Sequence, residues 1–320
     1  MQRDRARVRA RPRARHRGAR ALRGLSLVEL MVGVAIGLML VAVVLRGFAA
    51  TSNNASTNSL VSEFQTNGRY ALEVLRRELR HASLSPLLWE SAQLNINTSA
   101  AARDYGCGAG VSTSVLDGVR ASNDSNPYSA NCLADGTDRK YARGDVLTLR
   151  RLGLDAVTST LTNAPYARVS YGSGNVYLGG ETAAALAPPT YDYPVVSDIY
   201  FINEFTTSAT ESPKVPALYR LTLSSGANPT LVPELVASNV EHMEWQFGVS
   251  DSAGNVRFLN PGSITDWTTV VSARVWLLLR ASQTEPALAS SSYTLGDVSY
   301  TPGDSYRRAV VSSTIQLRNH

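Results

Sequence analysis

The chain has 320 residues, enough for one or two globular bodies with a sizeable core. Its formal net charge of +5 would fit a nucleic-acid-binding protein, but ten of its 31 basic residues and only one acid lie in residues 1–24. Without this leader, 21 bases face 25 acids, a net charge of −4, so the charge gives no reason to expect nucleic acid as a partner.

An uninterrupted apolar stretch follows the arginine-rich leader. Residues 25–45 contain one charged side chain, Glu29. As a helix rising about 1.5 Å per residue they would reach roughly 30 Å, the thickness of a bilayer's hydrocarbon core. We therefore expect a transmembrane helix over residues 25–50. Only Arg46 follows before an uncharged stretch that ends at Glu63, so the positive-inside rule places the N-terminus in the cytoplasm and the body of the chain outside it.

Glu29 is the unexpected residue in this stretch. A carboxylate inside a membrane costs on the order of 2.5–3.5 kcal/mol, so it needs a partner or a place near the headgroups. An ordinary cleaved signal peptide is disfavoured, because its apolar core spans about 7–15 residues. Here residues 30–45 alone form a run of 16. A plain uncleaved anchor stays open as an alternative.

The helical pattern continues beyond the anchor. Over residues 51–83 apolar side chains recur three, four or seven positions apart, which predicts an amphipathic helix with one face packed on a sheet. Pro86 favours an end of this helix near residues 81–85. The apolar stripe comprises Leu60, Phe64, Ala71, Leu75 and Leu79.

Residues 84–144 are rich in Ser, Asn, Gly and Ala and show little periodicity, so we expect a loop-rich region. Cys107 and Cys132 lie in it, and in an oxidising periplasm such a pair favours a disulfide over free thiols. Acidic fragments at residues 123–126 and 135–138 offer oxygen ligands but lack the EF-hand spacing, so turn chemistry explains them better than calcium binding. We expect no metal or cofactor site.

From residue 145 onward apolar and polar residues alternate, which is the period of a β-strand. Met243 and Trp245, for example, would face one side of a strand and His242 and Glu244 the other. Residues 145–320 are therefore expected to form an antiparallel sheet, and with the preceding helix the fold class is α+β. The expected strands cover residues 145–151, 166–171, 199–205, 218–223, 241–249, 270–280 and 309–318.

No catalytic constellation is recognisable in the sequence. Of the four histidines, His16 lies in the leader, His81 at a helix end, His242 on the polar face of a strand and His320 at the C-terminus. None has a triad or metal-ligand partner at a known spacing. We therefore expect a protein that is not an enzyme.

The residues around Glu29 resemble the processing motif of type IV prepilins. Residues 24–29 are GLSLVE: a glycine before the cut, a hydrophobic residue after it, and a glutamate five positions after the cut. The resemblance implies that prepilin peptidase cuts between Gly24 and Leu25 and that the amine of Leu25 is then methylated. It also implies that Glu29 neutralises the N-terminal amine of a neighbouring subunit. Gly33 and Gly37 would offer a small-xxx-small face to the helices of other pilins.

Further stretches are similar to PilW-type minor pilins: residues 67–82 in the helix, and residues 240–250, 270–280 and 307–319 in the C-terminal half. The resemblance implies a type IV pilin-like fold, in which a long N-terminal helix packs on an antiparallel sheet. It also implies a minor pilin that helps prime assembly of a type IV pilus and enters the fibre. Other minor pilins, the major pilin and the inner-membrane assembly platform would be its partners, and its head would lie in the periplasm before assembly.

Two alternatives stay open. A pseudopilin of a type II secretion system would have the same anchor and helix. A pilus-tip adhesin or DNA-uptake subunit belongs to a different class and would expose a binding patch within residues 87–235, the region with the least resemblance to PilW-type pilins.

Overall fold

The computed structural model describes residues 26–88, 93–108, 114–115, 117–128, 130–133, 137–285 and 288–318. The leader and Leu25 lie outside the described residues. For residues 49–50, 52–58, 61, 130 and 131 only the backbone is described. Contacts divide the chain into two units, residues 1–57 and 58–320. The division falls inside a helix, at residue 57, and Leu60 is the first residue of this helix in the core of the second unit among the side chains that the structure describes.

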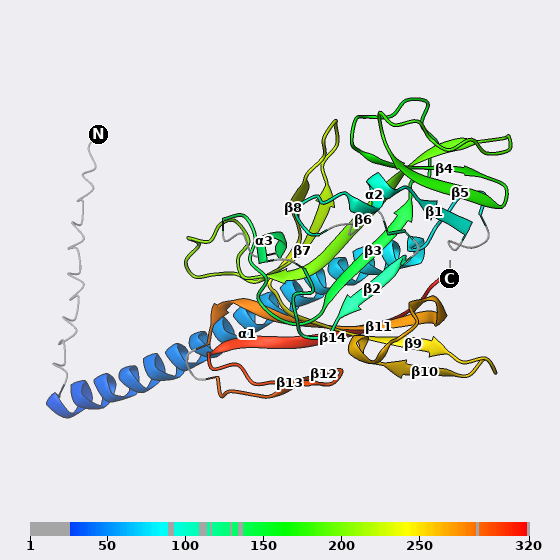
Figure 1. Cartoon of the computed structure of the whole chain (residues 1–320). Helices are drawn as coiled ribbons and strands as arrows, with labels where there is room; N and C mark the ends of the chain where they lie inside the picture. Colours follow the sequence, from blue (N-terminus) through cyan, green and yellow to red (C-terminus); the bar gives the residue numbers. More distant parts are fainter. Residues whose placement is uncertain are drawn as a thin grey trace, which may run out of the picture. The chain divides into compact units, whose positions relative to one another are not determined.

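Figure 1 shows the elements of the described residues. The helices are α1 (Leu27–His81), α2 (Thr98–Ala102) and α3 (Ala130–Leu133), with 3₁₀ turns η2 (Pro261–Ser263) and η3 (Trp267–Thr269). The strands are β1 (Leu94–Ile96), β2 (Val119–Ser122), β3 (Val146–Leu152), β4 (Pro165–Ser170), β5 (Ser173–Leu178), β6 (Tyr191–Asn203), β7 (Ala217–Leu223), β8 (Leu231–Ser238), β9 (Val240–Ser250), β10 (Val256–Leu259), β11 (Val270–Thr284), β12 (Tyr293–Leu295), β13 (Val298–Tyr300) and β14 (Tyr306–Gln316). The expected α+β class is confirmed.

Helix α1 ends where its sequence predicts. Its last residue is His81, and Ser83 then adopts a left-handed conformation with a φ of 61°. The Ser83 amide donates a hydrogen bond to the Arg150 carbonyl over 2.9 Å, and the Leu152 amide donates to the Leu84 carbonyl over 2.8 Å. The chain leaving the helix is therefore tied directly to strand β3.

The second unit contains two main sheets, where the sequence predicts a single one. In the eight-stranded sheet the order is β1-β5-β4-β6-β3-β2, and β7 pairs with β6 and β8. The other sheet has the order β10-β9-β11-β14, and β12 and β13 form a separate hairpin. All the described pairs are antiparallel except β1 with β5, which is parallel.

The expected strands all occur, but several further strands were not predicted. Strands β1 and β2 arise inside the region expected to be loops, and at three and four residues they are too short to show an alternating pattern. Strand β8 contains Pro233, which argues against a central strand. It pairs only with β7, so it is an edge strand, where proline is tolerated.

The main core of the second unit is built around the apolar stripe of α1. Leu75 and Leu79 are fully buried, in one cluster with residues of β3 and β6 from the larger sheet and of β9, β11 and β14 from the smaller one. The helix comes close to β11 and β14 at Gly68, where an added Cβ would lie 2.7 Å from the Leu279 Cδ1 atom. A larger residue here would require the Leu279 side chain to move, so glycine lets the helix approach the sheet this closely without rearrangement.

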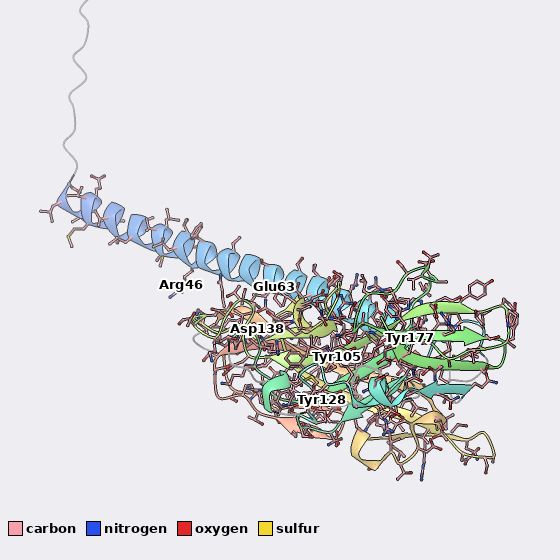
Figure 2. All side chains as sticks on the ribbon, turned by 45° about the horizontal axis from the view of Figure 1, so that its top comes forward. Arg46, Glu63, Tyr105, Tyr128, Asp138 and Tyr177 are labelled. Atoms are coloured by element: carbon pink, nitrogen blue, oxygen red, sulfur yellow. A yellow bond between two sulfur atoms is a disulfide. The ribbon has the colours of Figure 1, made fainter. Side chains whose placement is uncertain are left out.

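A second cluster contains the disulfide. Cys107 and Cys132 are bonded to each other and buried beside Tyr105, Phe201 and Tyr219, the last two from β6 and β7. Tyr105 and Tyr128, which also borders this cluster, are labelled in Figure 2. The disulfide therefore joins two parts of the loop-rich region to each other, and both parts pack on the larger sheet.

A buried ion-pair network joins the strands of the smaller sheet. The Arg308 guanidinium of β14 donates to both carboxylate oxygens of Glu241 on β9, over 3.0 Å for Nη2 to Oε1, and to Asp304 over 2.6 and 2.8 Å. The Tyr300 hydroxyl donates to Glu241 Oε1 over 3.2 Å, which brings strand β13 into the network. Only 1% of the Arg308 side chain and 5% of the Glu241 side chain are exposed. Arg308 lowers the pKa of Asp304 by its hydrogen bonds.

We expect Arg308→Ala to lower the free energy of unfolding by about 3–5 kcal/mol, because it removes the hydrogen-bonded cation of the buried Glu241 carboxylate and leaves it only Arg143, 4.0 Å away. Arg307→Ala is the matched control: its pair with Glu285 is 38% and 31% exposed, so the loss should stay below about 1 kcal/mol. Urea unfolding of the full chain in detergent measures both. Equal losses would contradict a structural role for the buried pair.

Replacing Cys107 and Cys132 together by serine should lower the free energy of unfolding by roughly 3 kcal/mol, because the denatured chain regains the freedom of the loop between them. A reductant should shift the urea midpoint of the natural protein towards that of the variant and leave the variant unchanged. A natural protein insensitive to reductant would contradict this contribution of the bond.

Candidate functional site

The N-terminal part of α1 is the most unusual surface of the described chain. Residues Leu27–Phe48 form 22 residues of helix with a mean hydropathy of 2.7, and none of this segment is buried within the structure. Exposed large apolar side chains occupy consecutive turns on every side of the helix. A helix that is apolar all round has to be covered by lipid or by other apolar helices. It is long and apolar enough to cross a membrane, and a signal sequence near the N-terminus can have the same length and composition.

Glu29 has a local partner that the sequence analysis missed. The Ser26 amide donates to Glu29 Oε2 over 3.0 Å, and the Glu29 amide donates to the Ser26 hydroxyl oxygen over 3.1 Å. This reciprocal pair is a capping box, which satisfies two amides at the start of the helix. Its sequence signal, a serine followed three residues later by glutamate, is present in residues 26–29. A carboxylate in the first turn also interacts favourably with the helix dipole.

Glu29, Gly33 and Gly37 follow one another at intervals of four residues and so lie along one stripe of the helix. A Cβ added at either glycine would meet no atom within 4 Å, so this stripe is open to another helix. The cleavage position between Gly24 and Leu25 lies outside the described residues. The structure therefore brings Glu29 together with the two glycines and leaves the cleavage position as a prediction.

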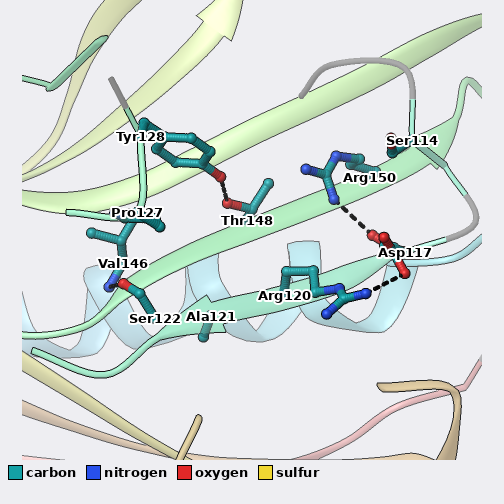
Figure 3. Close-up of a pocket in the computed structure, with 10 residues that line it drawn as sticks. All are labelled: Ser114, Asp117, Arg120, Ala121, Ser122, Pro127, Tyr128, Val146, Thr148 and Arg150. Atoms are coloured by element: carbon teal, nitrogen blue, oxygen red, sulfur yellow. Dashed lines mark hydrogen bonds and ion pairs between the residues drawn. The ribbon is translucent and has the colours of Figure 1, made fainter. Parts of the chain in front are cut away.

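The second unit has a pocket of about 310 Å³ (Figure 3). The pocket lies over β2 and β3, within residues 87–235, where an adhesin or DNA-uptake subunit would be expected to expose a binding patch. Its polar groups already have partners: Arg150 Nη1 donates to the Asp117 carbonyl over 3.0 Å, and Arg120 Nη2 donates to Asp117 Oδ1 over 2.8 Å. The hydroxyls of Tyr128 and Thr148 are hydrogen-bonded to each other. These contacts hold the walls of the pocket together and identify no ligand.

Two of the four histidines lie in the described part of the chain. His81 is half-buried at the last position of α1, while only 3% of His242 is exposed on β9. The sequence places His242 and Glu244 on a polar, outward strand face, but in the structure both side chains are buried. The connection between β2 and β3 comes close to this face: the Asp145 amide donates to the Met243 carbonyl over 2.8 Å.

Comparison with protein families gives a match over the C-terminal part of the chain, whereas no curated protein and no solved structure matches the chain. Residues 199–319, from within β6 through β14, match the family model of PilW, described as type IV pilus-assembly protein W. The matched segment includes the whole four-stranded sheet and the network of Arg308 and Glu241. This part of the chain is thus similar to a protein of type IV pilus assembly.

Proposed function

We propose that this protein is a minor pilin that helps prime assembly of a type IV pilus and is incorporated into it. The match of residues 199–319 to PilW carries the proposal. The exposed apolar helix over Leu27–Phe48 supports it independently, because a pilin needs a helix that is stable first in lipid and then among other pilin helices. The role is structural, and no catalytic step is proposed.

The biogenesis that we propose follows from the charge and hydropathy of the first 50 residues. The ten arginines of the leader keep the N-terminus in the cytoplasm, and the second unit is exported to the periplasm. Prepilin peptidase then cuts between Gly24 and Leu25, and the amine of Leu25 is methylated. An oxidising periplasm is also the compartment in which a bond between Cys107 and Cys132 persists.

Glu29 has capacity for a second partner in a filament. Its Oε2 atom accepts from Ser26, while Oε1 accepts no hydrogen bond from the described residues. A neighbouring helix that packs on Gly33 and Gly37 would lie along the same stripe and could bring its N-terminal amine to this oxygen. Capping and subunit pairing are therefore compatible uses of one carboxylate.

A type II secretion pseudopilin would have the same apolar helix, so that helix does not separate the two machines. The PilW match favours the pilus. A tip adhesin would need a ligand site, and the pocket over β2 and β3 is the place to look for it.

Three variants separate the two uses of Glu29. Glu29→Gln keeps an acceptor for the Ser26 amide but removes the charge, so helix capping should persist while incorporation into pili falls about tenfold or more, as expected for loss of a charge-assisted hydrogen bond worth roughly 1.5–3 kcal/mol. Glu29→Ala should lose both. Ser26→Ala should cost about 1 kcal/mol of capping and leave the charge in place.

The measurement is the ratio of the protein in sheared pili to that in membranes, by immunoblot. If Glu29→Gln is incorporated as well as the natural protein while Glu29→Ala is not, the carboxylate serves capping alone and the pairing role is wrong.

The glycine stripe gives a second prediction. Gly37→Leu should leave the helix apolar and membrane-inserted but keep a neighbouring helix at a greater distance, and incorporation into pili should fall. Ala35→Leu is the matched control, because it adds a similar side chain on the opposite side of the helix. Equal incorporation of the two variants would show that the stripe is not a packing surface.

A further inference from the structure

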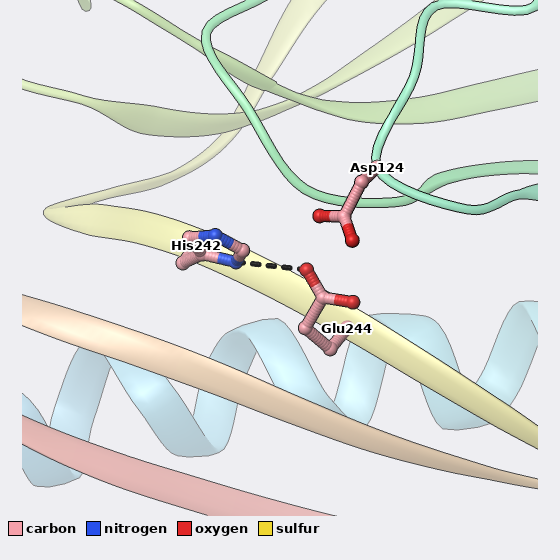
Figure 4. A group of neighbouring side chains, drawn as sticks. All are labelled: Asp124, His242 and Glu244. Carbon is pink, nitrogen blue, oxygen red and sulfur yellow. Dashed lines mark ion pairs between the residues drawn. The ribbon is translucent and has the colours of Figure 1, made fainter. Parts of the chain in front are cut away.

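A buried cluster of metal-ligating side chains lies where the two sheets of the second unit meet. Asp124 comes from the turn after β2, while His242 and Glu244 are alternate residues of β9 and so share one face of that strand (Figure 4). One donor atom of each residue lies within 4.8 Å of the other two. His242 Nδ1 and Glu244 Oε1 are 3.0 Å apart.

The donor atoms of β9 lack a hydrogen bond of good geometry. Glu244 is completely buried and 3% of His242 is exposed, and Glu244 Oε1, Glu244 Oε2 and His242 Nδ1 face one another and neighbouring carboxylates without a hydrogen bond of good geometry from the described residues. A buried carboxylate without donors costs several kcal/mol, so it has to be protonated or to meet a cation. Metal ions bind the neutral form of an imidazole.

Asp145 holds the two segments of the cluster together. Its Oδ1 accepts from the Asp124 amide over 3.0 Å, and its Oδ2 accepts from the Trp245 amide over 2.7 Å. Both oxygens are therefore occupied, and the turn that carries Asp124 is fixed to the strand that carries Glu244. Arg143, whose charge acts on His242, lies 4.0 Å from Glu241 and over the ring of Tyr300, so it is engaged by other groups.

We propose that Asp124, His242 and Glu244 bind one divalent transition-metal ion, with Zn²⁺ as the best fit, and that the ion cross-links the β2–β3 connection to strand β9. Zinc accepts both imidazole nitrogen and carboxylate oxygen and binds such a site more tightly than Mn²⁺ does, whereas calcium takes six to eight oxygen ligands. Zinc–ligand bonds of about 2.0–2.2 Å at the tetrahedral angle put neighbouring donors roughly 3.3–3.6 Å apart. His242 Nδ1 and Glu244 Oε1, at 3.0 Å, need to separate by only about half an ångström to hold the ion between them.

The site is open on one side. Asp124 is exposed, which gives an ion a path from solvent and leaves room for water as a further ligand. The β2–β3 connection and strand β9, which the ion would join, belong to different sheets, so the expected role is to stabilise the fold of the second unit. The inference does not depend on the proposed role in a pilus.

The test uses the full chain without an affinity tag, purified in detergent and stripped with a chelator. ZnCl₂, MnCl₂ and CaCl₂ are added separately; bound metal is counted after equilibrium dialysis, and thermal unfolding is followed by circular dichroism. We expect one zinc ion per chain, weaker binding of the other two ions, and an unfolding temperature raised by about 5 °C when zinc is at a hundred times its Kd.

Asp124→Asn and Glu244→Gln should each weaken zinc binding about tenfold or more. Asp124 is exposed, so its variant should fold even if that of Glu244 does not. His81→Gln and Asp251→Asn are the matched controls, a histidine and a turn aspartate outside the cluster, and should bind zinc as the natural protein does.

Absence of stoichiometric zinc would overturn the proposal, as would equal binding by the Asp124 and control variants. In the first case the carboxyl groups of the cluster would simply share protons. A preference for calcium would overturn the donor argument.

Discussion

The first half of α1 has an apolar surface that must be kept from water, and the proposed function of this protein depends on this requirement. Residues Leu27–Phe48 expose large hydrophobic side chains on all sides, and no part of the described chain covers them. Burial of such a surface is favourable by about 25 cal/mol per Å², so it has to be supplied by lipid or by other helices. The second half of the same helix is covered by the protein itself, because its apolar stripe lies at the centre of the core of the second unit.

The second unit combines that core with buried polar groups at the joins between its elements. Arg308 and Glu241 connect β14 to β9 and the β12–β13 hairpin, and Asp145 connects the start of β3 to β9. Strand β9 is common to both sets of contacts and lies in the segment that matches PilW. A buried polar group that loses its partner is costly, so each of these contacts disfavours arrangements of the strands in which the partners are apart.

Local patterns predicted most of the elements but not their arrangement. The helix end near His81 follows from Pro86, and the long strands follow from alternation, as in β9 and β11. The division into two sheets could not be predicted, because it depends on which strands pair over long distances in the sequence. The capping box of Ser26 and Glu29 was available as a motif and was missed. The cluster of Asp124, His242 and Glu244 has no sequence motif. Its members come together only when the β2–β3 connection covers a strand face that looks solvent-exposed in the sequence.

The most direct test of the proposed function is the N-terminal residue and mass of the protein recovered from membranes, in cells with and without prepilin peptidase. A minor pilin should begin at a methylated Leu25 when the peptidase is present and retain the leader when it is absent. An intact Met1 in both strains would indicate a plain membrane-anchored protein, and a cut near Ala50 would indicate a soluble exported one. Either result would contradict the account.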